Sequence, residues 1–136
     1  MSRDAEDELV EAAWSVLQNA YAPYSNFRVA AAVRGASGRV YAGVNVENAS
    51  YPVGLCAERS AIAAAVAGGE SALTCVAIAT DTENPVCPCG MCRQMIREFA
   101  EDLPIVLSAR GDKRTRHTLA ALLPESFSPA DLDSDS

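Results

Sequence analysis

The first part of the chain carries apolar side chains at the three- and four-residue spacing of an amphipathic helix. This pattern predicts a helix over residues 4–21, ended by Pro23. A second helix is predicted over residues 56–67, where alanine dominates and a glycine pair follows. A third helix is expected over residues 90–102, and a short one over residues 118–123. The apolar positions of the first helix are Leu9, Val10, Ala13, Trp14, Leu17 and Tyr21.

Strands are predicted where short runs rich in valine, isoleucine and alanine lie between turn residues. Residues 27–34 and 39–45 read as a β-hairpin closed by the four-residue loop at 35–38. Buried strands are expected over residues 74–80 and 105–107. Helices that alternate with strands indicate an α/β fold, in which helices cover a mixed sheet.

The chain length suits one folded unit, which we place at residues 1–130. Two segments, 47–55 and 81–89, contain proline with polar residues and are predicted to be loops. Residues 131–136 are acidic and polar, and we expect this tail to be disordered.

Charge and hydropathy exclude several classes of partner. The net charge is −7 with only 11 lysines and arginines, which argues against a nucleic acid polymer as partner. There is no apolar run of about 18 residues, so we expect no membrane partner. The first eight residues are charged and lack the apolar stretch of a signal peptide, which predicts a cytoplasmic protein.

The five cysteines point to a metal site. Their odd number, without a secretory signal, argues against a disulfide framework. Three of them fall within six residues, and in a reducing compartment such crowding indicates metal binding. The five are Cys56, Cys75, Cys87, Cys89 and Cys92.

A catalytic zinc site is predicted from Cys56, Cys89 and Cys92. Cys56 opens one predicted helix, and the Cys89-x-x-Cys92 pair opens another, so helix N-termini would favour their thiolates. Three thiolates fill three positions of tetrahedral zinc and leave the fourth for water. Glu58, two residues after Cys56, would take a proton from that water and pass it to the substrate. Arg59 is expected to hydrogen-bond to ligand sulfurs and offset their charge.

Alternative assignments remain for the other cysteines and for the only histidine. His117 could close a structural Cys₃His site, although the full pattern of Cys-Ala-Glu with Pro-Cys-x-x-Cys favours catalysis. Cys87 competes with Cys89 as a ligand, and Cys89 is preferred because it meets the helix start. Cys75 is expected to be a small core residue.

Several separated motifs in the same order resemble the small homotetrameric zinc-dependent cytidine deaminases. The resemblance runs from about residue 20 to residue 132 and implies a three-layer α/β/α sandwich with a mixed five-stranded sheet. It also implies one zinc ion per chain and a homotetramer of 222 symmetry. The matching motifs are Pro23-Tyr24-Ser25 with Phe27, Gly43-Val44-Asn45-Val46-Glu47-Asn48-Ala49-Ser50-Tyr51, Cys56-Ala57-Glu58-Arg59, Pro88-Cys89-Gly90-Met91-Cys92-Arg93-Gln94, and Leu122-Leu123-Pro124-Glu125-Ser126-Phe127.

The same resemblance implies roles for residues that would bind a nucleoside within one subunit. Phe27 would pack against the pyrimidine, and Asn45 and Glu47 would bind the ribose 3′-hydroxyl. Backbone groups near Ala57 and Cys89 would hold the amino group and the base edge. From the residues alone, Phe27 reads as core and the Asn45–Glu47 pair as turn residues.

Other segments are implied to act across subunit boundaries. Residues 49–51, which include Ala49 and Tyr51, would meet the 5′-hydroxyl end of a nucleoside in a neighbouring subunit. Phe127 would close a site across an interface. The alternative for Phe127 is that it docks the C-terminus on its own subunit.

The reaction implied is hydrolytic deamination of free cytidine and 2′-deoxycytidine to uridine and 2′-deoxyuridine with release of ammonia, a step of pyrimidine salvage. Zinc-activated hydroxide would attack C4, with Glu58 as the proton shuttle. Three rivals differ in substrate or class: a deaminase of the antibiotic blasticidin S, a zinc-stabilised binding module without activity, and a polynucleotide-editing deaminase. The acidic charge weakens the last of these.

Overall fold

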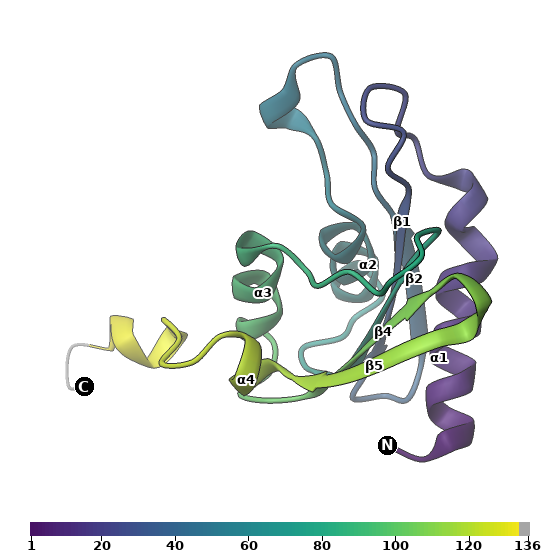
Figure 1. Ribbon diagram of the computed structural model, residues 1–136. Helices are drawn as coiled ribbons and strands as arrows, with labels where there is room; N and C mark the ends of the chain where they lie inside the picture. The colour runs from purple at the N-terminus through teal and green to yellow at the C-terminus, as the bar shows by residue number, and fades with distance from the viewer. Residues whose placement is uncertain (134–136) are drawn as a thin grey trace.

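A computed structural model describes residues 1–133, and its centre is a five-stranded sheet (Figure 1). The strand order is β2-β1-β3-β4-β5. Strands β3 and β4 are parallel, and the other neighbours are antiparallel, so the sheet is mixed as expected. The strands are β1 (Val29–Gly35), β2 (Val40–Val44), β3 (Leu73–Thr80), β4 (Pro104–Ala109) and β5 (Lys113–Thr118).

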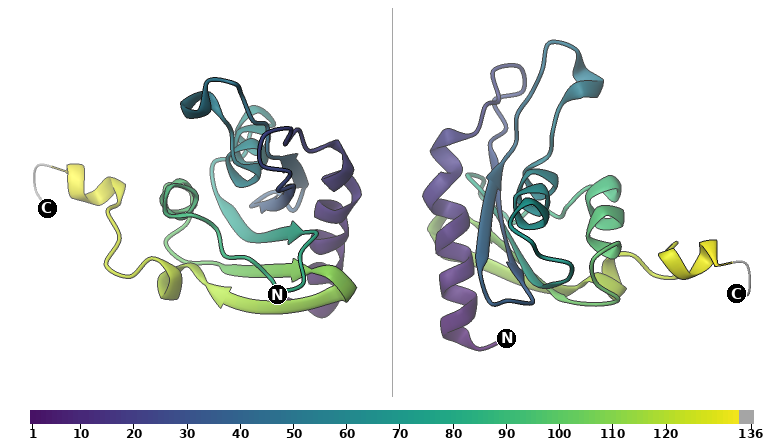
Figure 2. Two further views of the ribbon diagram at one scale, coloured as in Figure 1. Left: turned by 45° about the horizontal axis from the view of Figure 1, so that its top comes forward. Right: turned by 180° about the vertical axis from the view of Figure 1, so that it is seen from behind.

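Helices cover both faces of the sheet and complete three layers. Helix α1 packs against one face, and α2 and α3 lie side by side on the other (Figures 1 and 2). Four short 3₁₀ turns join these elements: Leu17–Asn19, Tyr51–Val53, Arg110–Asp112 and Pro129–Leu132. The α-helices are α1 (Arg3–Val16), α2 (Ala57–Ala67), α3 (Gly90–Arg97) and α4 (Leu119–Leu122).

The alternation of side chains along the central strands divides the core in two. Along β3, Val76 and Ile78 face α2 and α3, whereas Cys75 and Ala77 face α1. Cys75 is therefore a buried core residue, which confirms its expected role. The α2 side of the sheet is the side on which the predicted metal ligands lie.

A glycine allows α2 to approach the sheet closely. A Cβ atom on Gly43, in β2, would lie 2.4 Å from the backbone nitrogen of Ala61 in α2. Only glycine fits at this contact without moving the helix. The contact therefore fixes α2, whose first turn carries the predicted catalytic residues.

Two predicted helices end earlier than their sequence patterns suggest. The first ends at Val16 with a 3₁₀ turn to Asn19, because Tyr21 leaves the helix and forms a bridge with Val46. The third ends at Arg97 and not at residue 102. There the carbonyl oxygen of Phe99 accepts a hydrogen bond from the backbone nitrogen of Leu73 and joins the strand connection.

Strand β5 is the element whose position the hydrophobic pattern does not predict. Its six residues are all polar or charged, so they show no apolar alternation. It forms because the backbone pairs with β4 along its whole length, from Lys113 opposite Ala109 to Thr118 opposite Pro104.

Two segments extend from the body of the molecule. The loop over residues 46–55 projects at one end, and the arm after α4 runs out to the side (Figures 1 and 2). The arm includes the 3₁₀ turn Pro129–Leu132, which contains the first two residues of the predicted tail, and the disorder of that tail stays a prediction. Residues 134–136 of that tail lie outside the described residues.

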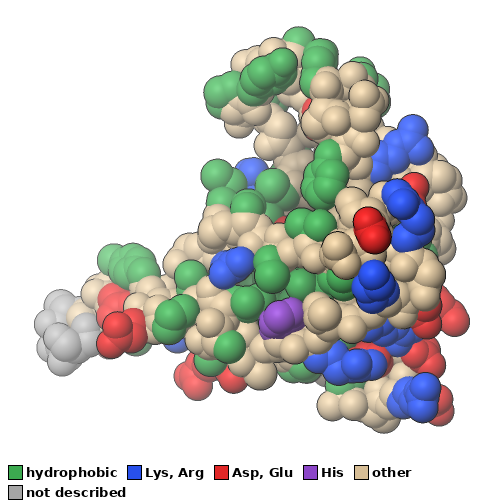
Figure 3. Space-filling view, in the orientation of Figure 1, with side chains coloured by type: hydrophobic (Ala, Val, Ile, Leu, Met, Phe, Trp, Pro, Cys, Tyr) green, Lys and Arg blue, Asp and Glu red, His purple; other side chains and the backbone are tan. Residues whose placement is uncertain are grey.

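The surface shows where apolar side chains gather. Hydrophobic side chains cover the projecting loop and part of the arm, and charged side chains gather on the side of β5 (Figure 3). Tyr51, Val53, Phe127 and Leu132 are each at least half exposed. Within residues 1–133, no helix has the length and apolar character needed to cross a membrane.

Candidate active site

Cys56 is fixed at the start of α2 by backbone pairing on its N-terminal side. Leu55 pairs with Val46, through hydrogen bonds of 2.9 Å in both directions. Cys56 then adopts an extended conformation as the N-cap residue of α2, and its carbonyl oxygen accepts from the backbone nitrogen of Ser60. The sulfur is thereby held at a helix N-terminus, as the sequence predicts.

Cys89 and Cys92 are placed by the first turn of α3. Cys89 is the N-cap residue, in an extended conformation, and its carbonyl oxygen accepts from the backbone nitrogen of Arg93 at 3.0 Å. Cys92 follows one turn later and is fully buried. The two sulfur atoms lie 3.5 Å apart.

The three predicted ligands form one cluster. The Sγ atoms of Cys56, Cys89 and Cys92 all lie within 4.8 Å of one another. A Zn–S distance of about 2.3 Å with tetrahedral angles requires sulfur separations of about 3.8 Å. The cluster therefore fits one zinc ion with little movement, and it is formed by soft thiolate donors, which zinc prefers.

Electrostatics of the cluster favour a cation. Burial, with the neighbouring carboxylate and thiols, raises the pKa of Cys92 above its ordinary value, and burial also raises that of Cys56. Burial acts in the same direction on Cys89, but hydrogen bonds from the backbone and thiol of Cys92 outweigh it and lower the pKa. A divalent cation would supply the charge that stabilises all three thiolates.

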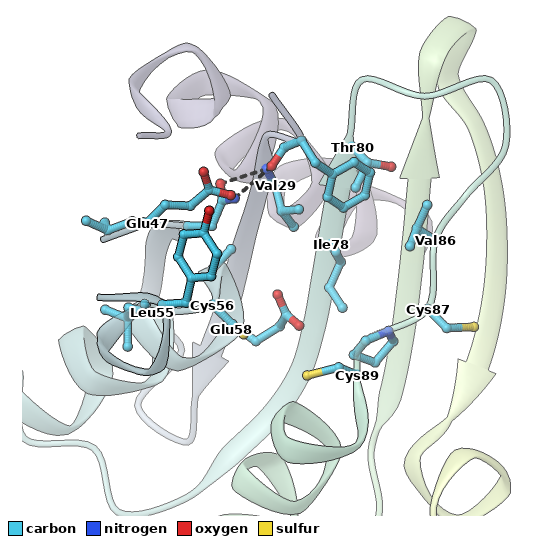
Figure 4. A pocket seen from close by; sticks show the side chains of 17 residues that line it. Val29, Glu47, Leu55, Cys56, Glu58, Ile78, Thr80, Val86, Cys87 and Cys89 are labelled. Atoms are coloured by element: carbon cyan, nitrogen blue, oxygen red, sulfur yellow. Dashed lines mark hydrogen bonds between the residues drawn. The ribbon is translucent and has the colours of Figure 1, made fainter. Parts of the chain in front are cut away.

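Glu58 lies beside the cluster and is almost completely buried, with 5% of its surface exposed. Burial raises the pKa of this carboxyl above 4.5, while a hydrogen bond with Cys92 opposes the shift. Its carboxylate points into a cavity (Figure 4). Such a group, next to a metal, can accept and return a proton.

The alternatives for the remaining ligand candidates are decided by geometry. His117 lies on β5 opposite Ile105, near Thr115, and is not part of the cluster. Cys87 lines the cavity but its sulfur points away from that of Cys89 (Figure 4). Among the described residues, the cysteine cluster thus consists of Cys56, Cys89 and Cys92.

A cavity of about 500 Å³ opens above the cluster. Its size lies within the range of small-molecule sites, which are mostly apolar with a few convergent polar groups. Of the residues predicted to bind or convert substrate, it is lined by Phe27, Asn45, Glu47, Tyr51, Ala57 and Glu58, and of the predicted ligands by Cys56 and Cys89.

The polar side chains at the far end of the cavity are held by neighbouring backbone. Asn45 Oδ1 accepts from the backbone nitrogen of Val29 at 2.9 Å, and Asn45 Nδ2 donates to the carbonyl oxygen of Phe27 at 2.8 Å. Glu47 accepts hydrogen bonds from Tyr24 and Ser25. The hydrogen bonds from Ser25 outweigh the effect of burial and lower the pKa of Glu47, which keeps it ionised.

Three predicted site residues lie outside this cavity or at its edge. Ala49 is exposed on the projecting loop, and Tyr51 lines the cavity but is 74% exposed. The ring of Tyr51 stacks edge-on against Tyr24, with 5.8 Å between centroids. Phe127 lies on the C-terminal arm, 51% exposed, where its carbonyl oxygen accepts from Gln94 Nε2.

The two arginines next to the ligands differ in what they contact. Arg59 is half-buried, and within residues 1–133 it makes no hydrogen bond or ion pair, so its expected contact with sulfur stays a prediction. Arg93 donates to the carbonyl oxygens of Pro88 at 2.8 Å and Leu122 at 2.7 Å. Arg93 is therefore the arginine that holds the ligand loop, the segment 81–89 that ends at Cys89.

Several cavity residues were not among the predicted site residues. Val29, Ile78 and Thr80 line the apolar wall with Val86 and Pro88. Strand alternation could have indicated the first three, because Val29 pairs with Thr80 across β1 and β3, and Ile78 shares the face of Thr80. Nothing in the loop sequence marks Val86.

Comparison with known proteins identifies the family. The family described as the cytidine and deoxycytidylate deaminase zinc-binding region matches residues 3–107. A cytidine deaminase from Sporosarcina psychrophila is 40% identical over 127 residues, covering 93% of each chain. A probable cytidine deaminase from Dictyostelium discoideum is 36% identical over 133 residues, covering 97% of this chain and 90% of the relative.

A solved structure agrees in fold. The crystal structure of a cytidine deaminase from Burkholderia pseudomallei has a TM-score of 0.84 at 40% identity, and the match covers 93% of this chain and 100% of that one. This chain belongs to the cytidine and deoxycytidylate deaminase family, whose matching region is a zinc-binding one, and its cysteine cluster is positioned to bind one metal ion.

Proposed function

We propose that this protein hydrolyses free cytidine and 2′-deoxycytidine to uridine and 2′-deoxyuridine with release of ammonia. The observation that carries the proposal is the buried carboxylate of Glu58 beside a cluster of three cysteines, at the base of a cavity of about 500 Å³. The cytidine deaminases to which the chain is similar support the choice of substrate.

Zinc held by Cys56, Cys89 and Cys92 would supply Lewis acidity and lower the pKa of bound water. Glu58 takes a proton from the attacking water and delivers it to N3 of the cytosine ring. After the water oxygen has bonded to C4, Glu58 moves the proton of the new hydroxyl to the amino group, and the C4–N bond breaks to release ammonia. The apolar wall that includes Ile78 excludes bulk water and strengthens these electrostatic contacts.

The binding residues favour a nucleoside over a nucleotide. Phe27 offers an apolar ring for the pyrimidine, and Asn45 with Glu47 offers polar groups for the ribose 3′-hydroxyl. The described residues that line the cavity include no lysine or arginine, whereas Glu47 is an ionised carboxylate. A phosphate would be repelled there, so a free nucleoside is the substrate and a nucleic acid polymer is not.

An ultraviolet assay of the zinc-loaded protein tests this function. We expect cytidine and 2′-deoxycytidine to be converted, and cytidine 5′-monophosphate and blasticidin S to be converted far more slowly. Comparable turnover of blasticidin S would favour the antibiotic deaminase, and no turnover of any of the four would favour a binding module.

We further propose a homotetramer that shares sites between subunits. Ala49 and Tyr51 are exposed, and Phe127 lies on an arm that leaves its own body, so each is free to meet a neighbouring subunit. Closed symmetry is the usual outcome of self-association. Light scattering should give the mass of four chains, and mixed Glu58→Gln and Phe127→Ala subunits should regain activity. A fully active monomer would exclude this assembly.

A cytoplasmic location is proposed from the thiols. All five cysteines are free, and three of them form the proposed zinc cluster, which fits a reducing compartment, where thiols stay reduced. Cell fractionation should recover the protein with cytoplasmic markers, and recovery outside the cytoplasm would contradict the proposal.

A further inference from the structure

The hydroxyl group of Ser25 joins two residues that line the cavity. Its oxygen donates to Oε2 of Glu47 and accepts from the backbone nitrogen of Phe27 at 3.0 Å. Ser25 itself is exposed; it lines an adjoining pocket together with Glu47 and Tyr51 but does not line the main cavity. It therefore contacts the site through Glu47 and Phe27.

Backbone hydrogen bonds hold the turn that carries Ser25 against Glu47. The backbone nitrogen of Asn26 donates to the carbonyl oxygen of Ala22 at 2.9 Å, and Asn26 has φ of 58°, a left-handed conformation that asparagine tolerates. The backbone nitrogens of Tyr24 and Ser25 both donate to Glu47 Oε1, at 3.0 and 3.1 Å. One carboxylate thus accepts three hydrogen bonds from a two-residue segment.

The path continues from Phe27 to Asn45. The peptide nitrogen of Phe27 donates to Ser25, and its carbonyl oxygen accepts from Asn45 Nδ2 at 2.8 Å. Glu47, Ser25, Phe27 and Asn45 therefore form one continuous series of hydrogen bonds. Moving any member changes the position of the others.

The unused hydrogen-bonding capacity of this series suits one hydroxyl group. A carboxylate has about four acceptor positions, and three on Glu47 are taken. Asn45 Nδ2 uses one hydrogen on Phe27 and keeps a second. One free acceptor and one free donor, both on residues that line the cavity, match a hydroxyl group, which donates and accepts.

We propose that Ser25 is a positioning residue that holds the Glu47 carboxylate in the arrangement that binds the sugar hydroxyl of the substrate. The inference rests on the proposed function. Ser25 makes no contact with the reacting atoms, so its loss affects binding of the nucleoside and leaves the proton transfers of Glu58 intact.

Steady-state kinetics of Ser25→Ala test the proposal. We expect the KM for cytidine to rise about tenfold, the effect of losing a hydrogen bond to a charged group, with kcat within about twofold of the parent. Ser25→Thr, which keeps the hydroxyl, should restore most of the affinity. Ser15→Ala is the matched control, because Ser15 donates only to the carbonyl oxygen of Ala12 on α1.

A substrate that lacks the 3′-hydroxyl distinguishes the positioning of Glu47 by Ser25 from a general loosening of the turn. For 3′-deoxycytidine, Ser25→Ala should raise KM less than threefold, since Glu47 then has no hydroxyl to bind. When Glu47→Gln is already present, adding Ser25→Ala should raise the KM for cytidine little further. If Ser25→Ala does not fold, Ser25→Cys carries the same expectations.

Two results would overturn the proposal: an unchanged KM for cytidine in Ser25→Ala, or an equal rise in KM for cytidine and 3′-deoxycytidine. Failure of the proposed function is distinct, because the parent protein would then not convert cytidine at all.

Discussion

The guanidinium group of Arg93 donates a hydrogen bond of 2.8 Å to the carbonyl oxygen of Pro88, the residue directly before Cys89 of the cysteine cluster. The same side chain donates to the carbonyl oxygen of Leu122, at the end of α4. A single arginine thus ties the ligand loop to the C-terminal part of the chain, and a planar group with several donors is needed to reach both carbonyls.

Arg93→Lys should therefore weaken zinc retention, because lysine offers one point of contact where arginine bridges two. We expect faster loss of zinc to a chelator and a lower melting temperature, with a stability loss of about 1–3 kcal/mol from the unpaired carbonyl. Arg97→Lys is the control, since Arg97 contacts Ser126 and Ala100 and not the ligand loop. Equal zinc loss in both variants would contradict the role of Arg93.

The choice of Cys89 over Cys87 predicts opposite outcomes for two serine variants. Cys89→Ser removes a thiolate from the cluster and should lose most of the zinc, whereas Cys87→Ser should keep one zinc per chain. Metal analysis of the purified proteins measures this directly. Full zinc content in Cys89→Ser, with loss in Cys87→Ser, would reverse the assignment.

Glu58→Gln should separate metal binding from catalysis. Glutamine keeps the shape of the buried side chain but cannot shuttle protons, so turnover should fall by about 10²–10⁴-fold or more. Zinc content and melting temperature should stay near those of the parent, because Glu58 is not a member of the cysteine cluster. Turnover within tenfold of the parent would remove Glu58 from the proposed mechanism.

The cysteine pattern predicted the cluster of three cysteines because the spacing of such residues is a local property of a helix start. Cys56, Cys89 and Cys92 all lie in or next to a first helical turn, where few conformations are available. The contact of Glu47 with Ser25 joins residues 22 positions apart and leaves no local trace in the sequence. Such contacts depend on how the segments pack.

The same distinction explains the strands. The sequence of β3 is a continuous apolar run because its residues alternate between two buried faces, each covered by helices. Such a run can be recognised from the sequence alone. Strand β5 has no such pattern, and its location depends on pairing with β4 and on Arg114 and Arg116, which reach Glu6 on α1. The resemblance to a five-stranded fold implied one more strand, but hydrophobic periodicity could not place it.

The contact between α1 and β5 depends on pH. Glu6 is 5% exposed and accepts hydrogen bonds from Arg116 Nε at 2.7 Å and from Arg114 Nη1 at 3.0 Å. The hydrogen bond from Arg116 has the largest effect on the pKa of Glu6, and that from Arg114 acts in the same direction. Together they outweigh burial and lower this pKa below 4.5. Asp7 and Asp112 also face Arg114, so the arginine keeps acidic partners when Glu6 is changed.

A lowered pKa in the folded state means that Glu6 stabilises the fold at pH values above 4.5, and that this contribution disappears as the pH falls through the folded-state pKa. Glu6→Gln should therefore reduce the free energy of unfolding by about 1–3 kcal/mol at neutral pH, and the difference from the parent should shrink below pH 4.5. Thermal unfolding of both proteins across this range measures the difference, and zinc release in acid affects both alike.

Glu8→Gln is the control, because Glu8 is 64% exposed and lies 3.5 Å from Arg34. This substitution should reduce the free energy of unfolding by less than about 0.5 kcal/mol. A constant difference between Glu6→Gln and the parent at every pH would show that packing, and not the charge of Glu6, holds β5 against α1.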